Sequence, residues 1–485
     1  MRRSIGSDAL KLTISKLITM AIALVNAMLL SRFRTLEEYG TYSQLLLIIN
    51  LATTFFMLGL PNSINYFLAR EDTKEGKQKF LSVYYSLSTI LSIITGLILV
   101  ISAPILIHYF DNPLLRNYVY FLAVFPWTKI IMSSIEHVLI IYNKTKYVMI
   151  YKIANSLALL LIIILVQALK MTFPIYILFY LIVESIFAIL VYVLVRNFTQ
   201  RLSLSLDRKL VGNILKFSIP IGLATMVGRL SIELDKIVIG RFFTTEELAI
   251  YTNAARELPV AIISSALTAV LMPHLVRLLK ENKNKSAVEL WAHSIILSYI
   301  LISLVAFGVL TYAPEVMTLL YSSKYISGSS VFRIYTLVLL LRVTYFGMIL
   351  NSKGKTKFIF YSSLLSLILN LVLNYSFYKL FGFIGPAIAT LLSIAIVQFA
   401  QLIATSKIVN ITIKSIFPWK ELAKITLINV VFSIAFFNLK NIVNLENILG
   451  NVGESLVMGL IWGILYIGIM YKKIRISWNY LNSPH

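Results

Sequence analysis

Long apolar runs recur along this chain of 485 residues, and they constrain its fold more than any other feature. Each run is roughly 20 residues long, enough for a helix to cross about 30 Å of hydrocarbon. Hydrophobic residues make up 58% of the chain and charged residues only 13%, about half the share found in soluble domains. The runs lack the alternation of a membrane-spanning barrel. The sequence therefore predicts an all-α integral membrane protein.

About fourteen transmembrane helices are predicted from these runs. They cover approximately residues 9–31, 42–68, 80–108, 115–141, 147–169, 174–196, 213–240, 249–278, 288–313, 331–351, 357–379, 383–406, 421–439 and 453–471. The connections are at most roughly 10 to 20 residues long, too short to form a separate domain. Because the first apolar run is long enough to remain as a span, we expect no cleaved signal peptide.

The distribution of lysine and arginine predicts the orientation of the chain. If the N-terminus and alternate connections share one side, that side holds 29 of the 44 basic residues and the other side holds nine. Cytoplasmic connections carry the excess of lysine and arginine. We therefore expect a multi-pass protein of the cell (inner or cytoplasmic) membrane with both termini in the cytoplasm. The net charge of +23 follows from this topology and does not indicate nucleic-acid binding.

An internal repeat divides the chain. LLSRFRTLEEYGTYSQ (29–44) aligns without gaps on VIGRFFTTEELAIYTN (238–253), and Lys-Thr-Lys recurs at 144–146 and 355–357. In both copies the TxEE sequence predicts a helix N-terminus capped by threonine. Six spans separate the copies, so the halves insert with the same orientation, related by a pseudo-twofold axis along the membrane normal with a cavity between them. The predicted domains are a six-helix lobe (1–200), its repeat (201–410), and two additional helices with a cytoplasmic tail (411–485).

Charged residues lie at membrane depth within the apolar stretch 218–259. Arg229, Glu233 and Lys236 are spaced i, i+4, i+7 and share one helix face, while Asp235 lies beside that face. A charge at this depth costs from about 2.5 to more than 10 kcal/mol. We therefore expect these side chains to face a wet cavity or each other. The other basic residues considered inside spans are Lys16, Lys129 and Arg256.

Several segments resemble one family of transporters. SKLITMAIALVNAMLLSRFRTLEEYGTYS and GLPNSINYFLAR resemble the N-terminal half of Wzx-type oligosaccharide flippases, which belong to the multidrug/oligosaccharidyl-lipid/polysaccharide exporter superfamily. LKFSIPIGLATMVGRLSIELDKIVIGRFF is similar to their seventh span, including Asp235, and LNLVLNYSFYKLFGFIGPAIATLLS to the start of their twelfth. The resemblance covers residues 1 to about 410. It implies two six-helix lobes in a V, with two extra helices.

The resemblance also implies a substrate, an undecaprenyl-pyrophosphate-linked oligosaccharide of O-antigen, capsule or exopolysaccharide. It would move from the cytoplasmic to the outer leaflet by alternating access through a basic central cavity. Such a substrate needs cations for its pyrophosphate and polar groups for its glycan. We predict a site lined by Lys16, Asn65, Lys129, Arg229, Glu233, Lys236 and Arg256, with Asp235 as a structural or coupling residue.

Purely structural interpretations of these residues stay open. Lys16 could extend to the cytoplasmic interface, Asp235 and Lys236 could form a structural pair, and Arg256 could pair with Glu257. Glu233 could hold its two neighbouring cations until substrate arrives, or could be the protonatable group of an ion-coupled cycle. Glu184 and Arg342 are interpreted as solvated groups or helix contacts.

The same residues bear on alternative functions and on the source of energy for transport. A lipid II flippase would look much the same, whereas a multidrug exporter would need an acidic cavity. A glycan polymerase or ligase is disfavoured because the outer loops are short and the five histidines form no cluster. We therefore predict no enzyme activity, metal or cofactor. Without a GxxxxGK[ST] motif, transport would use a Na+ or H+ gradient, the membrane potential, or consumption of the product on the outer side. Expected partners are the lipid-linked oligosaccharide, membrane lipids and, as a further option, polysaccharide polymerase or ligase machinery.

Overall fold

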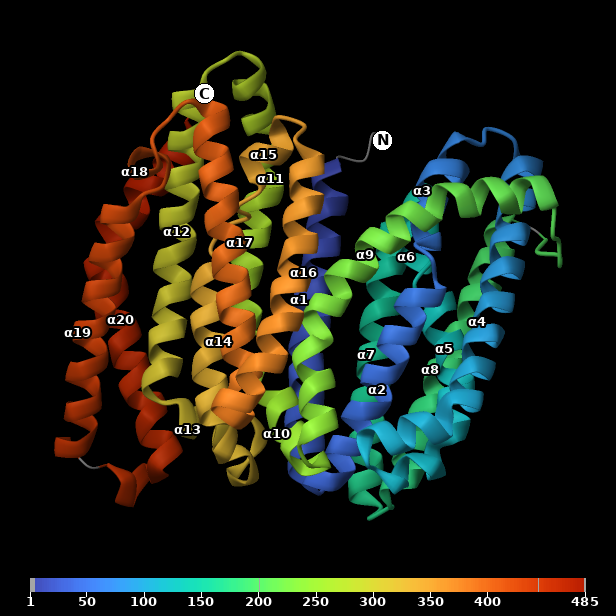
Figure 1. The fold of residues 1–485 in the computed structure, drawn as a ribbon, viewed down its shortest axis with the longest axis horizontal. Coiled ribbons are helices and arrows are strands. Elements are labelled where there is room, and N and C mark those ends of the chain that lie inside the picture. The colour runs from blue at the N-terminus through green and yellow to red at the C-terminus, as the bar shows by residue number, and fades with distance from the viewer. Residues whose placement is uncertain (1–4, 200, 444, 484–485) are drawn as a thin grey trace. The chain divides into compact units, whose positions relative to one another are not determined.

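The computed structural model describes residues 5–199, 201–443 and 445–483, and these residues form helices joined by short turns (Figure 1). The described part of the chain contains no strand, so the prediction of an all-α protein is confirmed. Contacts between residues divide the chain into two compact units, Met1–Ala249 and Ile250–His485.

Up to the end of the seventh predicted span, the described residues of the first unit form nine α-helices. They are α1 (Ile5–Phe33), α2 (Leu36–Phe56), α3 (Leu60–Phe67), α4 (Lys74–Phe110), α5 (Val119–Met132), α6 (Ile135–Ile141), α7 (Thr145–Ala168), α8 (Phe173–Thr199) and α9 (Arg208–Phe242). α9 is the helix that carries the predicted charged face, and it packs on α2, α3 and α4. It bends along its length (Figure 1) and contains Pro220, which removes a backbone hydrogen bond.

The boundary between the units falls inside α10 (Thr245–Ala254), which lies within the second copy of the repeat, 238–253, except for its last residue. The capping predicted from TxEE is present in both copies. The Thr35 and Thr244 hydroxyl groups each accept a hydrogen bond of 3.1 Å from the backbone N–H of Glu38 and Glu247. The two glutamates accept bonds of 3.1 and 2.9 Å in return from the threonine backbone N–H groups.

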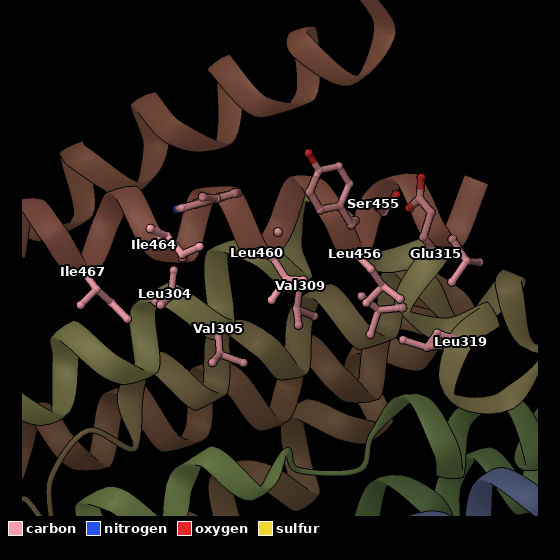
Figure 2. Close-up of a pocket in the computed structure, with 17 residues that line it drawn as sticks. Leu304, Val305, Val309, Glu315, Leu319, Ser455, Leu456, Leu460, Ile464 and Ile467 are labelled. Atoms are coloured by element: carbon pink, nitrogen blue, oxygen red, sulfur yellow. The ribbon is translucent and has the colours of Figure 1, made fainter. Parts of the chain in front are cut away.

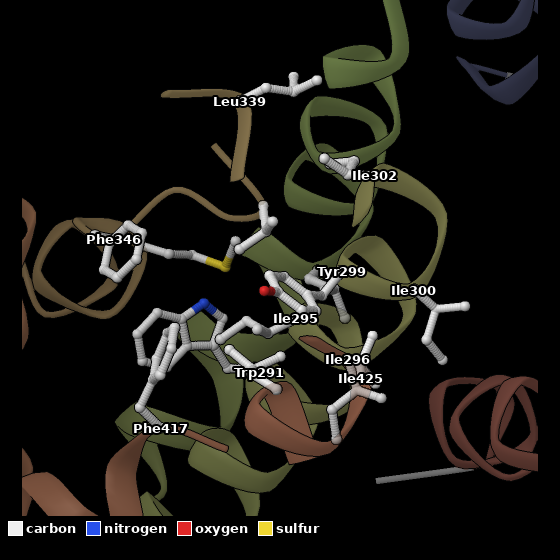
Figure 3. Packing of buried hydrophobic residues seen from close by; sticks show 14 of the residues in the cluster. Trp291, Ile295, Ile296, Tyr299, Ile300, Ile302, Leu339, Phe346, Phe417 and Ile425 are labelled. Carbon is white, nitrogen blue, oxygen red and sulfur yellow. The ribbon is translucent and has the colours of Figure 1, made fainter. Parts of the chain in front are cut away.

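The second unit contains the remaining helices. They are α11 (Ile262–Lys280), α12 (Asn284–Thr311), α13 (Ala313–Tyr321), α14 (Ser329–Leu341), α15 (Met348–Ser352), α16 (Thr356–Phe381), α17 (Gly385–Val409), α18 (Ile413–Ile416), α19 (Trp419–Val443) and α20 (Glu446–Asn482). Its core contains Trp291, whose indole lies near Phe346 and Phe417 in Figure 3. The indole N–H donates to the Thr344 hydroxyl at 2.8 Å.

Side-chain hydrogen bonds attach the last two long helices to α12. Tyr299 bonds Thr426 of α19 at 2.6 Å. One turn further on, the buried Asn429 amide donates to both Ser303 of α12 and Tyr466 of α20, each at 3.2 Å. Such bonds hold helices together where the hydrophobic effect between helix and lipid gives little preference. α19 and α20 are therefore integral parts of the second unit.

Eleven helical segments of the described chain are long and apolar enough to cross a membrane, or up to twelve if α2 and α3 form one span bent by 43°. The predicted spans 357–379 and 383–406 correspond to α16 and α17, which lie side by side and join through a tight turn at Gly382. The predicted span 331–351 is instead broken into α14 and α15, each too short to cross alone. The number fourteen stays a prediction.

The break between α2 and α3 brings the chain into backbone contact with α9. Leu58 and Gly59 both have positive φ, 51° and 68°. A Cβ on Gly59 would lie 2.6 Å from the backbone nitrogen of Gly222, and a Cβ on Gly222 would lie 2.4 Å from the carbonyl carbon of Leu58. Only glycine at both positions permits this approach.

The close approach predicts the effect of adding one methyl group. Gly222→Ala should destabilise the protein by roughly 1–3 kcal/mol, because the new Cβ must push backbone atoms apart. Gly228→Ala on the same helix is the matched control, since nothing lies within 4 Å of its Cβ position. It should leave stability unchanged or raise it by up to about 1 kcal/mol. Thermal unfolding of the purified protein distinguishes the two, and equal effects would contradict the proposed contact.

Candidate functional site

The charged face of α9 forms as its spacing predicts. The Glu233 carboxylate accepts from Lys236 Nζ at 2.8 Å and pairs with Arg229 Nη2 at 3.4 Å. Glu233 is buried, whereas the Arg229 side chain is 44% exposed and that of Lys236 is 21% exposed. One buried carboxylate thus holds two cations, of which Arg229 extends furthest from the protein.

Asp235 lies beside this face and is buried. Its Oδ1 accepts a hydrogen bond of 2.8 Å from the backbone N–H of Lys236, the next residue of the same helix. The carboxylate therefore contributes a further negative charge next to the cluster. Its role as a structural or coupling residue stays a prediction.

A second charged cluster joins three other helices of the first unit. Lys129 of α5 lies 3.8 Å from Glu184 Oε2 of α8, and Asn155 of α7 donates to Glu184 Oε1 at 3.4 Å. The Glu184 side chain is 2% exposed and that of Lys129 is 37% exposed. Lys129 Nζ also lies 4.9 Å from the centre of the Phe125 ring, at cation–π distance. As in α9, a buried carboxylate anchors an accessible cation.

Glu184 was not among the predicted site residues. The sequence signal that points to it is a single acid in the middle of the apolar run 174–196. Its partner lies 55 positions earlier, on a helix whose packing the sequence does not reveal, so the pair itself could not be inferred.

Two predicted residues of the first unit lie apart from these clusters. Asn65 of α3 is exposed, and its Oδ1 lies 3.2 Å from Nδ1 of His137 on α6, close to an ion pair between Glu136 and Lys152. Lys16 is exposed on α1 and makes no ion pair with the described residues. Its extension to an interface therefore stays an open alternative.

The second unit contains Arg256 in the turn after α10. The neighbouring Glu257 forms an ion pair of 2.7 Å with Arg342, at the end of α14. All three residues line one small cavity. Arg342, which the sequence suggested to be a solvated group or helix contact, lies at the break of the predicted span 331–351.

A buried amide pair was also missed. Asn370 and Asn374 of α16 are spaced i, i+4 and both are buried. Asn374 donates to Asn370 Oδ1 at 3.0 Å, and Asn370 donates to the Thr390 hydroxyl of α17 at 3.1 Å. The two asparagines inside an apolar run were the available signal.

An apolar groove of about 580 Å³ lies between α12, α13 and α20. Figure 2 shows Glu315 and Ser455 at one end and aliphatic side chains, including Ile464 and Ile467, along the rest. Glu315 is bound to Lys440 at 2.6 Å, and both side chains are largely buried. The groove therefore offers hydrocarbon contact and no accessible cation for a phosphate.

The α9 cluster presents two cations that share one carboxylate. Arginine and lysine that share one carboxylate can transfer their hydrogen bonds to a phosphate of similar geometry. Among the described residues, no group of three or more histidine, aspartate and glutamate side chains is arranged to hold a metal ion.

Comparison with known proteins places this geometry in context. The chain is similar to a probable low-salt glycan biosynthesis flippase, Agl15, of Haloferax volcanii, with 24% identity over 248 residues. The match covers 50% of this chain and 51% of the relative, so the chain spans about half the length of the curated relative it matches.

Two solved structures share the fold. The lipid II flippase MurJ in an inward closed conformation superposes with a TM-score of 0.76 at 16% identity, covering 95% of this chain and 98% of that one. A multidrug transporter of the MATE family in an inward-facing conformation gives 0.64 at 13% identity, covering 83% and 98%. At these identities the likeness shows the fold alone.

The sequence pattern of the family described as "Polysaccharide biosynthesis protein" matches residues 29–330, more than half of the chain. The resemblance inferred from the sequence is thereby confirmed, and the chain belongs to this family of polysaccharide biosynthesis proteins.

Proposed function

We propose that this protein is a flippase that moves an undecaprenyl-pyrophosphate-linked oligosaccharide from the cytoplasmic to the outer leaflet by alternating access. Family membership, the similar glycan flippase and the transporter fold support the proposal. The observation that carries it is the cluster of Arg229, Glu233 and Lys236 on a membrane-spanning helix. Such charges are rare in spans and mark substrate pathways.

The substrate would compete with Glu233 for its two cations. In the substrate-free protein the carboxylate holds Arg229 and Lys236, which satisfies all three charges at membrane depth. A pyrophosphate carries more negative charge than one carboxylate and can accept the paired donors of a guanidinium. When the pyrophosphate binds, Arg229 would therefore exchange Glu233 for the phosphate before Lys236 does. Arg229 is the more exposed cation and has the longer contact with Glu233.

The same proposal assigns supporting roles to the other predicted residues. Lys129 is an accessible cation anchored by Glu184, and Asn65 offers an exposed amide for a glycan hydroxyl. Lys16 and Arg256 are further cations, and Asp235 is proposed to set the charge balance of the α9 cluster. A lipid II-type substrate carries the same pyrophosphate, so the α9 cluster would bind it in the same way as the lipid-linked oligosaccharide.

Orientation, class and partners complete the proposal. The excess of lysine and arginine on alternate connections supports cytoplasmic termini in the cell membrane. The relatives in both comparisons are flippases or transporters, which supports a transporter that is not an enzyme. The enzymes that join or polymerise the exported glycan are the proposed neighbours.

Removing one cation tests the cluster. Arg229→Gln should lower transport of a lipid-linked oligosaccharide by about tenfold, because a hydrogen bond to a charged group contributes roughly 1.5–3 kcal/mol. Lys216→Gln, an exposed lysine near the start of the same helix, should leave transport unchanged. Translocation in proteoliposomes gives the rate.

Accessibility supplies the second readout, because the chain contains no cysteine. Single cysteines at Lys16, Arg229 and Lys236 should react with a membrane-impermeant thiol reagent, and substrate should protect them. If they do not react and sugar export continues, the charges are structural and the proposed site is wrong.

Glu233 is expected to act as a competitor of the substrate. Glu233→Gln should bind undecaprenyl pyrophosphate about five- to tenfold more tightly, because a neutral amide holds the cations less strongly than a carboxylate. Transport should become slower, since no carboxylate recovers the cations on release. Glu246→Gln, an exposed acid at the start of α10, is the control. Weaker binding by the Glu233 variant would show that Glu233 only positions the cations.

We propose the membrane potential as the energy source, with Na+ or H+ as alternatives. Outward movement of a pyrophosphate from a negative interior gains about 2.3 kcal/mol per charge per 100 mV. This corresponds to roughly a fiftyfold shift between leaflets for one uncompensated charge. Dissipating the potential in proteoliposomes with a potassium ionophore should slow outward transport. Unchanged transport in that assay, combined with a requirement for a Na+ or H+ gradient, would replace this mechanism.

A further inference from the structure

A cavity of about 650 Å³ lies in the second unit, within the size range of small-molecule sites. Its walls come from α12, the break between α14 and α15, α17 and the first two turns of α19. The lining residues used below are Tyr299, Phe346, Gln398, Phe417, Trp419 and Ala423. We refer to this cavity as the α17–α19 pocket.

Aromatic side chains form one wall of the α17–α19 pocket. Phe346 stacks on Phe417 with ring centres 5.5 Å apart, and Phe417 contacts Trp419 at 4.7 Å. The Phe417 ring also lies 6.0 Å from that of the buried Trp291, centre to centre, and Figure 3 shows the three side chains. These residues connect the pocket wall to the core, so the wall is rigid and the cavity is already formed.

The broken span explains why a cavity can exist here. Irregular backbone at membrane depth is tolerated where it is buried in protein or lines a cavity. Gln398 Nε2 donates to the carbonyl oxygen of Leu341, the last residue of α14, at 3.0 Å. The backbone carbonyl group of Leu341 at the pocket wall therefore already has a hydrogen-bond donor within the protein. The rest of the pocket surface is largely hydrocarbon.

Three lysines belong to the segment that leaves the pocket wall at Leu402 of α17 and returns to it at Phe417 and Trp419, or follow it directly. Lys407, Lys414 and Lys420 are exposed and make no ion pair with the described residues. Lys420 follows Trp419 of the pocket wall directly. The nearby Glu421 is already bound by Lys424 and Lys473. An apolar slot next to three unpaired lysines complements an amphiphile with a negative headgroup.

We propose that the α17–α19 pocket binds an acyl chain of an anionic phospholipid, with the headgroup phosphate on Lys407, Lys414 and Lys420. Basic pockets between transmembrane helices recognise anionic lipid headgroups in this way. Each lysine near an anionic headgroup adds a similar amount to the binding free energy. A zwitterionic lipid would fill the cavity equally well but would gain less from the lysines. The inference does not depend on the transported substrate, because no residue proposed for transport belongs to it.

Native mass spectrometry of the full chain tests the headgroup contact. The protein is reconstituted in nanodiscs of equal phosphatidylglycerol and phosphatidylcholine, released, and its retained lipids are counted. Wild type should retain phosphatidylglycerol preferentially. Combined Lys407→Gln, Lys414→Gln and Lys420→Gln should weaken that retention by about tenfold or more. The control replaces three exposed lysines of the first unit, Lys74, Lys146 and Lys209, with glutamine and should retain lipid as wild type does.

A second variant tests the acyl chain separately. Ala423→Phe places a ring in the cavity and keeps every lysine, so it should reduce the retained phosphatidylglycerol while its unfolding temperature confirms folding. Ala395→Phe on α17 repeats the test from the opposite wall. Equal retention of both lipids by wild type, or unchanged retention in the filled variants, would overturn the proposal. Displacement of phosphatidylglycerol by undecaprenyl phosphate at equal concentration would also overturn it and assign the pocket to the substrate tail.

Discussion

A charge placed in hydrocarbon must find a partner, and the arrangement of helices in this protein follows from that requirement. Within the first unit, Glu233 sits between two cations of its own helix, and Glu184 draws Lys129 and Asn155 from two other helices. Within the second, Lys440 of α19 is bound to Glu315 at the start of α13, a pair that lies just beyond the ends of the predicted spans 421–439 and 288–313. Each pair brings helices together or stiffens one helix, so the in-span charges are part of the fold as well as candidates for function.

The exposure of the two partners distinguishes two kinds of ion pair in this protein. The Arg229 and Lys129 side chains are 44% and 37% exposed, while their carboxylates are 8% and 2% exposed. A phosphate can reach such a cation without moving the acid that anchors it. Lys440 and Glu315 are both shielded, at 12% and 16%, so neither can exchange its partner without disrupting the packing. Pairs of the first kind suit transient anion binding, and the second kind suits permanent attachment of α19.

Local signals were predictable from the sequence and long-range partners were not. The i, i+4, i+7 spacing fixed the shared face of Arg229, Glu233 and Lys236, and the repeated TxEE identified two capping boxes, because both features lie within one helical turn or two. The partner of Lys129 lies on another helix, so only packing reveals Glu184. The predicted span 331–351 carries two arginines, Arg333 and Arg342, and α14 ends at the second of them. The tertiary bonds at the break, from Trp291 to Thr344 and from Gln398 to the carbonyl group of Leu341, come from other helices and could not be inferred from this segment.

The residues proposed to bind substrate and the proposed lipid pocket lie in different parts of the chain. The family pattern covers 29–330, which includes the α9 cluster and the Lys129–Glu184 pair. Most of the α17–α19 pocket and the helices bound to it lie beyond residue 330. These helices are joined to α12 by a row of polar contacts, and α12 lies inside the matched region. A lipid held against α17 and α19 would therefore act on the second unit through α12, without contacting the charged residues proposed to bind the pyrophosphate.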